Sequence, residues 1–207
     1  MRRPVRGKQP NSRMCLVCGL ENSAGLHAHF YELDGGDLLA RFTAGEAHQS
    51  YPGRLHGGLA AAMLDETIGR AVMVGNADVW GVTLELTTRF LKPLPLGQEL
   101  RVLARLTKQT RRGFEGTGEV LLPDGTAAAT GVGKYLKLPI EKIADFDVEA
   151  QQWRVVTRPD DPDEVESILG PLDDPEVDRR RAEVEATRPP ADMPAYVAEL
   201  YRVPLLT

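Results

Sequence analysis

The chain has 207 residues and a formal net charge of −5, with 42% hydrophobic and 27% charged residues. This composition is typical of globular proteins and excludes fibrous and wholly disordered chains. No segment is apolar enough to form a signal peptide or a membrane span, so we expect a cytoplasmic protein with no membrane partner. The acidic excess lies beyond residue 139, with 17 Asp/Glu against 8 Lys/Arg. Without its basic opening segment the rest of the chain is near neutral, which indicates no nucleic-acid partner.

The first part of the chain combines a basic opening with a pair of cysteines. Residues 1–13 are polar and contain two prolines, so we expect a loose lead-in outside the core. Cys15 and Cys18 are the only cysteines. One such pair supplies half of a closed zinc site, which His27, His29 or another chain would have to complete. We therefore expect two reduced thiols and no metal.

Strand and helix patterns follow in a clear order. Residues 26–33 and 38–43 are short β-type runs around an Asp-Gly-Gly-Asp turn, which predicts a hairpin. Residues 57–74 are rich in Ala, Leu and Met and predict one mostly buried helix of about five turns. Four longer alternating runs come next, at residues 79–91, 99–109, 114–122 and 126–138. Their short connections favour antiparallel pairing, so the predicted fold class is α+β, with the helix held against a curved antiparallel sheet.

The end of the chain differs from this domain, which we place at residues 14–138. Acidic residues and prolines interrupt residues 139–207, and short helices are expected only near residues 176–186 and 195–202. We interpret this segment as an acidic C-terminal extension that is partly helical or partly disordered.

An aspartate in the predicted helix requires an explanation, because a buried carboxylate must find hydrogen bonds or change its pKa. Glu66 has Arg70 four residues later and is expected to form an exposed ion pair. Asp65 has Gly69 at that spacing and therefore no local partner. Asp65 either makes a polar contact with a neighbouring strand or belongs to a functional site.

The start of the same helix suggests a second chemical group. Gly57 and Gly58 leave unpaired amides at the positive end of the helix dipole, where a carbonyl oxygen can gain negative charge. The alternative is that both glycines only allow a sharp entry from loop to helix. His56 beside them either caps the helix or orients the substrate without proton transfer. Nine residues separate His56 from Asp65, roughly 13 Å along the axis, so a shared substrate requires a two-fold dimer.

These residues carry a family resemblance that covers about residues 14–138. It rests on His56-Gly57-Gly58, Ala61, Asp65, Gly69, Thr83 to Phe90 and Pro93-Leu94-Pro95-Leu96-Gly97, with Cys15-Leu-Val-Cys-Gly, Asn22 and Gly25-Leu26 before them. In this pattern the chain resembles the PaaI-type hotdog thioesterases. The resemblance implies a long central helix wrapped by an antiparallel sheet, dimers or dimers of dimers, acyl-CoA substrates, and no cofactor or metal.

The resemblance also assigns roles to single residues. The family's acid matches Asp65, its polarising amide matches Gly57, and its histidine matches His56. A strand hydroxyl near the acid matches Thr83, although a β-branched strand residue needs no function to be there.

One departure from the family pattern concerns the residues before the helix. Relatives often carry an asparagine six residues before the histidine, where this chain has Ser50, and we expect Gln49 beside it to supply the missing amide. Gly58 and Glu66 complete the substrate-binding residues expected on the helix. Arg111 and Arg112, before the strand that starts near residue 114, are either contacts for CoA phosphates or a solvated turn.

The predicted reaction is hydrolysis of acyl-CoA to free acid and CoA. Asp65 would either activate water as a general base or attack the thioester directly. The alternative is a non-catalytic acyl-CoA binding or sensing module on the same fold. A dehydratase is a third possibility, which the absence of a hydratase-like Asp and His pair disfavours.

Overall fold

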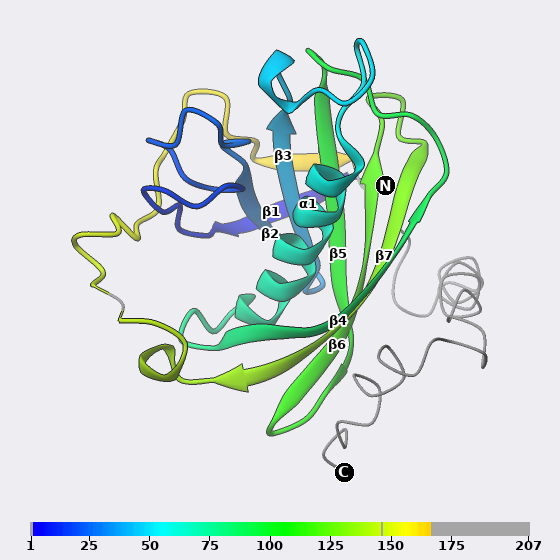
Figure 1. The fold of residues 1–207 in the computed structure, drawn as a ribbon. Coiled ribbons are helices and arrows are strands. Elements are labelled where there is room, and N and C mark those ends of the chain that lie inside the picture. Colours follow the sequence, from blue (N-terminus) through cyan, green and yellow to red (C-terminus); the bar gives the residue numbers. More distant parts are fainter. Residues whose placement is uncertain (1, 146, 167–207) are drawn as a thin grey trace, which may run out of the picture.

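The computed structural model describes residues 2–145 and 147–166 (Figure 1). Its elements are β1 (Arg2–Lys8), β2 (His29–Leu33), β3 (Leu38–Thr43), η1 (Glu46–His48), α1 (Gly57–Arg70), η2 (Ala71–Met73), β4 (Trp80–Phe90), β5 (Glu99–Gln109), β6 (Gly113–Leu121), β7 (Ala127–Leu138), η3 (Ile140–Lys142) and β8 (Glu164–Glu166). The strands form one sheet in the order β4-β7-β6-β5-β3-β2-β1-β8. Every neighbouring pair is antiparallel. The predicted hairpin, buried helix and four long strands are therefore confirmed.

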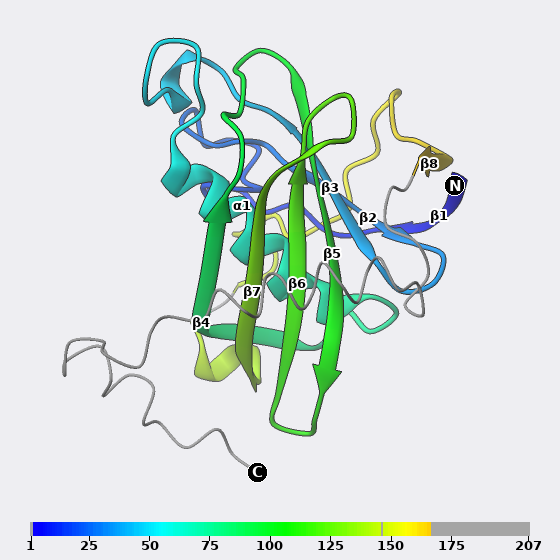
Figure 2. The ribbon, with the colours of Figure 1, turned by 90° about the vertical axis from the view of Figure 1, so that its right-hand side faces the viewer.

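The helix α1 lies along the inner face of the curved sheet (Figures 1 and 2). Its side chains Met63, Leu64 and Ile68 are completely buried. Two facing glycines, Gly118 on β6 and Gly131 on β7, pair with each other and lie beneath Leu64 and Ile68. Because glycine has no Cβ, the helix can approach the sheet closely at this point.

The opening of the chain differs from its expected structure. Residues 2–8, expected as part of a loose lead-in, form β1, which pairs with β2 on one side and β8 on the other. The basic side chains that suggested a solvated segment find acidic partners: Arg3 contacts Asp37 at 2.5 Å, and Lys8 contacts Asp161 at 2.6 Å. Long-range ion pairs of this kind leave no local sequence signal.

The segment after β7 returns across the molecule to the edge formed by β1. Asp161 anchors it, because the carboxylate accepts hydrogen bonds from Lys8 and from the Tyr31 hydroxyl at 2.7 Å. The expected helices near residues 176–186 and 195–202 lie outside the described residues. In the described part of the chain, no helix has the length and apolar character that crossing a membrane requires.

Candidate active site

The start of α1 is capped by the residue before it. His56 takes an extended conformation, and its Nδ1 accepts a hydrogen bond from the Gly58 amide at 2.9 Å. This bond uses the Gly58 amide, one of the two amides that the sequence suggested for a carbonyl oxygen. Within the described residues the Gly57 amide donates no hydrogen bond. The Phe90 ring of β4 lies close to Gly57, 3.5 Å from the position that a Cβ would occupy there.

Asp65 is half-buried in the middle of α1 and is held by two hydroxyl groups. The Thr83 hydroxyl on β4 donates to Asp65 Oδ1 at 2.9 Å, and the Tyr135 hydroxyl on β7 donates to the same oxygen at 3.2 Å. Thr83 and Tyr135 face each other across the β4–β7 ladder. The carboxylate thus does contact the neighbouring strands, and Thr83 is the strand hydroxyl beside it.

Burial sets the electrostatic state of this cluster. Desolvation raises the pKa of Asp65, and the hydrogen bonds from Thr83 and Tyr135 offset part of that rise. Burial and the nearby Asp65 charge also raise the pKa of Tyr135, so its hydroxyl stays protonated and available as a donor. Tyr135 could not be predicted as a site residue, because an aromatic residue in an alternating strand carries no functional signal of its own.

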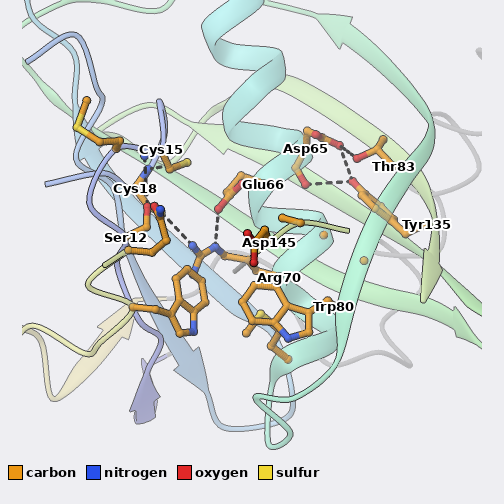
Figure 3. Close-up of a pocket in the computed structure, with 17 residues that line it drawn as sticks. Ser12, Cys15, Cys18, Asp65, Glu66, Arg70, Trp80, Thr83, Tyr135 and Asp145 are labelled. Atoms are coloured by element: carbon orange, nitrogen blue, oxygen red, sulfur yellow. Dashed lines mark hydrogen bonds and ion pairs between the residues drawn. The ribbon is translucent and has the colours of Figure 1, made fainter. Parts of the chain in front are cut away.

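A cavity of about 510 Å³ opens beside this cluster (Figure 3). Asp65, Thr83 and Tyr135 lie on one side of it. Toward the other side lie the thiol-bearing loop and the second half of α1, with Cys15, Cys18, Glu66 and Arg70. The remaining lining is largely apolar and includes Met14, Met73, Trp80 and Trp153. The Trp80 and Trp153 rings are in contact, with centroids 5.1 Å apart.

The Glu66–Arg70 ion pair is confirmed, with Arg70 Nε 2.7 Å from Glu66 Oε1, but its expected exposure is wrong. Arg70 is only 5% exposed. Its guanidinium lies 4.3 Å from the Phe30 ring centroid and 4.8 Å from that of Trp153. Burial disfavours its charge, but the attraction of Glu66 and Cys18 outweighs this effect and leaves the pKa of Arg70 raised. The pair therefore belongs to the cavity wall.

The cysteines are free thiols that share a polar environment. A hydrogen bond from Cys15 lowers the pKa of Cys18 to about 6, with help from Arg70 and against the effect of burial. The same hydrogen bond and burial raise the pKa of Cys15. The third side chain beside the two sulfur atoms is Glu66, whereas His27 bonds to the backbone oxygen of Asn22 at 2.7 Å.

Five predicted substrate-binding residues do not line this cavity in the described subunit: Gly58 at the start of α1, and four residues of exposed loops. Gln49 and Ser50 are exposed in the loop before α1, and Gln49 Oε1 accepts from the Gly53 amide at 2.7 Å. Arg111 and Arg112 are exposed at the turn between β5 and β6. None of the four meets Asp65 within one subunit, and their roles stay predictions.

Part of the sequence is similar to known proteins. Residues 52–129 match the thioesterase superfamily. Mouse acyl-coenzyme A thioesterase 13 is 29% identical over 72 residues, which cover 35% of this chain and 51% of the mouse protein. The human protein of that name is 27% identical over 74 residues, which cover 36% of this chain and 53% of the human protein. The chain thus spans about half the length of the curated relatives it matches.

Solved structures agree with the fold. A crystal structure of a thioesterase superfamily protein superposes with a TM-score of 0.55 and 28% identity, covering 59% of this chain and 63% of that one. Zebrafish thioesterase superfamily member 2 gives a TM-score of 0.51 and 19% identity, covering 57% and 88%. The second likeness shows the fold alone. With its antiparallel sheet around one central helix, this chain has the hotdog fold, and its residues 52–129 are similar to the thioesterase superfamily.

Proposed function

We propose that the chain hydrolyses an acyl-CoA thioester to the free acid and coenzyme A, with Asp65 as the catalytic carboxylate. The observation that carries this proposal is a half-buried carboxylate, oriented by two hydroxyl groups, at the wall of a 510 Å³ cavity. Its raised pKa makes it a stronger base than an exposed aspartate. The partial similarity to acyl-coenzyme A thioesterases supports the substrate class.

In the proposed reaction, a water oxygen attacks the thioester carbonyl carbon while Asp65 accepts the water proton. The carbon–sulfur bond then breaks, and the departing CoA thiolate takes up the proton that Asp65 accepted, which restores the carboxylate. Direct attack by Asp65, with a mixed anhydride that water later hydrolyses, needs the same carboxylate. Thr83 and Tyr135 are positioning residues in either route, because they fix the direction of the carboxylate.

The Gly57 amide is proposed to polarise the carbonyl. It sits at the positive end of α1, and the His56 ring already occupies the neighbouring Gly58 amide. Eight residues of helix separate Gly57 from Asp65, about 12 Å along the axis. That gap is too long for both groups to act on one carbonyl, so each site is proposed to use Gly57 of one subunit and Asp65 of another.

The open edge of β4 supports such a dimer. β4 is the terminal strand of the sheet, and Leu84 and Phe90 on it are 50% and 56% exposed. Thr83 contacts Asp65, while Phe90 lies beside Gly57. An antiparallel pairing of two β4 strands, with Thr83 opposite Phe90 of the second subunit, would bring Asp65 next to the second subunit's Gly57. The exposed residues Gln49, Ser50, Arg111 and Arg112 are proposed to contact the substrate at the surface of the protein.

The first experiment is a thiol-release assay with short, long and aryl acyl-CoAs. Asp65→Asn should lower the rate by about two to four orders of magnitude, since it removes a general base without changing shape. Asp78→Asn is the matched control, because Asp78 is exposed and does not line the cavity. If the protein hydrolysed none of these thioesters but bound one of them tightly, acyl-CoA sensing would be the better functional interpretation.

The second experiment tests the shared site by mixing two inactive variants. Gly57→Leu should block amide access and Asp65→Asn should remove the acid, so each homodimer should be nearly inactive. A mixed dimer regains one intact site and should show about half the native rate, because one of two symmetric sites survives. Subunit exchange is followed separately by mass. Exchange without recovered activity would mean that the site does not combine Gly57 and Asp65 from two subunits.

A further inference from the structure

The second polar cluster of the cavity lies on the other side from Asp65, Thr83 and Tyr135, and no proton transfer of the proposed hydrolysis is assigned to it. Cys15 Sγ, Cys18 Sγ and a carboxylate oxygen of Glu66 all lie within 4.8 Å of one another. They come from two elements, the loop after β1 and the middle of α1, and all three line the cavity (Figure 3). The fold therefore brings together three side chains that are metal ligands elsewhere in proteins.

The loop that carries the thiols is shaped around Cys15. The backbone amides of Val17 and Cys18 both point at Cys15 Sγ, at 3.3 and 3.5 Å. Gly19 closes the turn by donating to the Cys15 oxygen at 2.8 Å, and a Cβ at Gly19 would lie 2.4 Å from that oxygen. The turn thus excludes other residues at this position, and it gives the Cys15 sulfur two amide donors that stabilise a thiolate.

The rest of the protein holds this loop rigidly. The Asn11 side-chain amide donates to the Cys18 and Ala28 backbone oxygens, at 2.8 and 2.9 Å. Two further backbone hydrogen bonds, from Leu26 and Ala28, fix the residues between the cysteines. Ser12 Oγ lies 3.4 Å from Cys18 Sγ. Few side-chain torsions would need to change for the sulfur atoms to approach a common partner.

Charge decides which partner fits. With both thiols deprotonated, Cys15, Cys18 and Glu66 carry three negative charges, and the buried Arg70 contributes one positive charge. Arg70 already bridges the set, since Nη2 lies 3.0 Å from Cys18 Sγ and Nε lies 2.7 Å from Glu66 Oε1. The cluster is left with a charge of −2, which one divalent cation neutralises, and charges in such a poorly hydrated place require compensation.

We propose that Cys15, Cys18 and Glu66 bind one thiophilic divalent cation, of which zinc is the prime example. Two thiolates and one carboxylate match the ligand preferences of zinc, and the fourth position would face the cavity, where water can enter. In a tetrahedral zinc site with bonds of about 2.3 Å, ligand atoms lie about 3.8 Å apart, so atoms that are now farther apart than this, within the 4.8 Å limit, would move closer by side-chain rotation. Binding displaces the thiol protons to solvent.

The test is a titration of the full chain, reduced, stripped of metal and kept free of oxygen, with Co²⁺. We expect one Co²⁺ per chain, with a near-ultraviolet thiolate-to-cobalt charge-transfer band, tetrahedral d–d bands in the visible region, and displacement by Zn²⁺. Cys15→Ser and Cys18→Ser should each weaken the charge-transfer band and the affinity. Glu66→Gln should keep the charge-transfer band, shift the d–d bands and weaken affinity by about tenfold or more.

Glu115→Gln provides the matched control, because Glu115 lies on β6 and does not line the cavity. This variant should bind Co²⁺ as the unaltered chain does. The titration of the unaltered chain is decisive even if a cysteine variant fails to fold, since the charge-transfer band requires thiolate ligands. A spectrum without that band would overturn the proposal. So would a chain that binds no Co²⁺ and instead forms a Cys15–Cys18 disulfide. None of these readouts depends on thioester hydrolysis.

Discussion

The close contact between α1 and the sheet makes a sharp prediction about two neighbouring glycines. Gly118 and Gly131 face each other on β6 and β7, beneath the same helix. A Cβ at Gly118 would lie 2.9 Å from Ile68 Cγ1, whereas a Cβ at Gly131 would have its nearest neighbours at 3.4 Å. The first distance requires Ile68 or the helix to move, and the second is an ordinary van der Waals contact.

We therefore expect Gly118→Ala to destabilise the protein by about 1–3 kcal/mol, the usual cost of overfilling a packed core. Gly131→Ala should change stability by less than about 1 kcal/mol, because no atom must shift and alanine restricts the unfolded chain. Both substitutions add one methyl group to adjacent strands, so their difference isolates the clash with Ile68.

The measurement is urea denaturation of both variants at one fixed protein concentration, since self-association would otherwise alter apparent stability. Equal midpoints for the two variants, or a more stable Gly118→Ala, would show that the helix is not packed as closely as described. A Cβ at Gly118 would then not clash with Ile68.

Three further predictions concern the site, the returning segment and pH. Tyr135→Phe should lower kcat/KM about threefold to tenfold with little change in the unfolding midpoint, since it removes one hydrogen bond that orients the carboxylate; an unchanged rate would remove its positioning role. Asp161→Asn should cost about 1–3 kcal/mol and speed proteolysis after β7, because it weakens the contact with Lys8, whereas exposed Asp160→Asn should not. Burial lowers the pKa of His29 from 6.5 to about 4. Between pH 4 and 6.5 the His29 imidazole is therefore protonated in the unfolded chain but not in the folded one. The contribution of the neutral His29 to the free energy of unfolding, up to about 3 kcal/mol, should be present above pH 6.5 and lost as the pH falls toward 4. His29→Gln should make the free energy of unfolding less dependent on pH in this interval. An unchanged slope in the variant would contradict the assignment.

The sequence predicted those features that depend on local periodicity. The four long strands and α1 repeat their apolar residues over many positions, so their bounds differ from the expected ranges by only a few residues. Asp65 could be singled out because a carboxylate in an apolar helix conflicts with its surroundings. Glu66 and Arg70 could be paired because four residues separate neighbours on a helix.

What the sequence could not show depends on contacts between distant segments. β1 resembles a solvated lead-in until Asp37 and Asp161 are placed beside its basic residues. The buried Arg70 guanidinium contacts the rings of Phe30 and Trp153, which both lie far from it along the chain. Tyr135 reaches Asp65 only through the pairing of β7 with β4.

The two ends of the sheet have unequal capacity for growth. At one end β4 offers eleven residues of open edge with exposed apolar side chains. At the other, within the described residues, β8 has only three, and two of these are the glutamates Glu164 and Glu166. Short, charged edges repel a further strand. In the proposed β4–β4 dimer both remaining ends of the joined sheet would be β8, so strand addition would stop after one pairing.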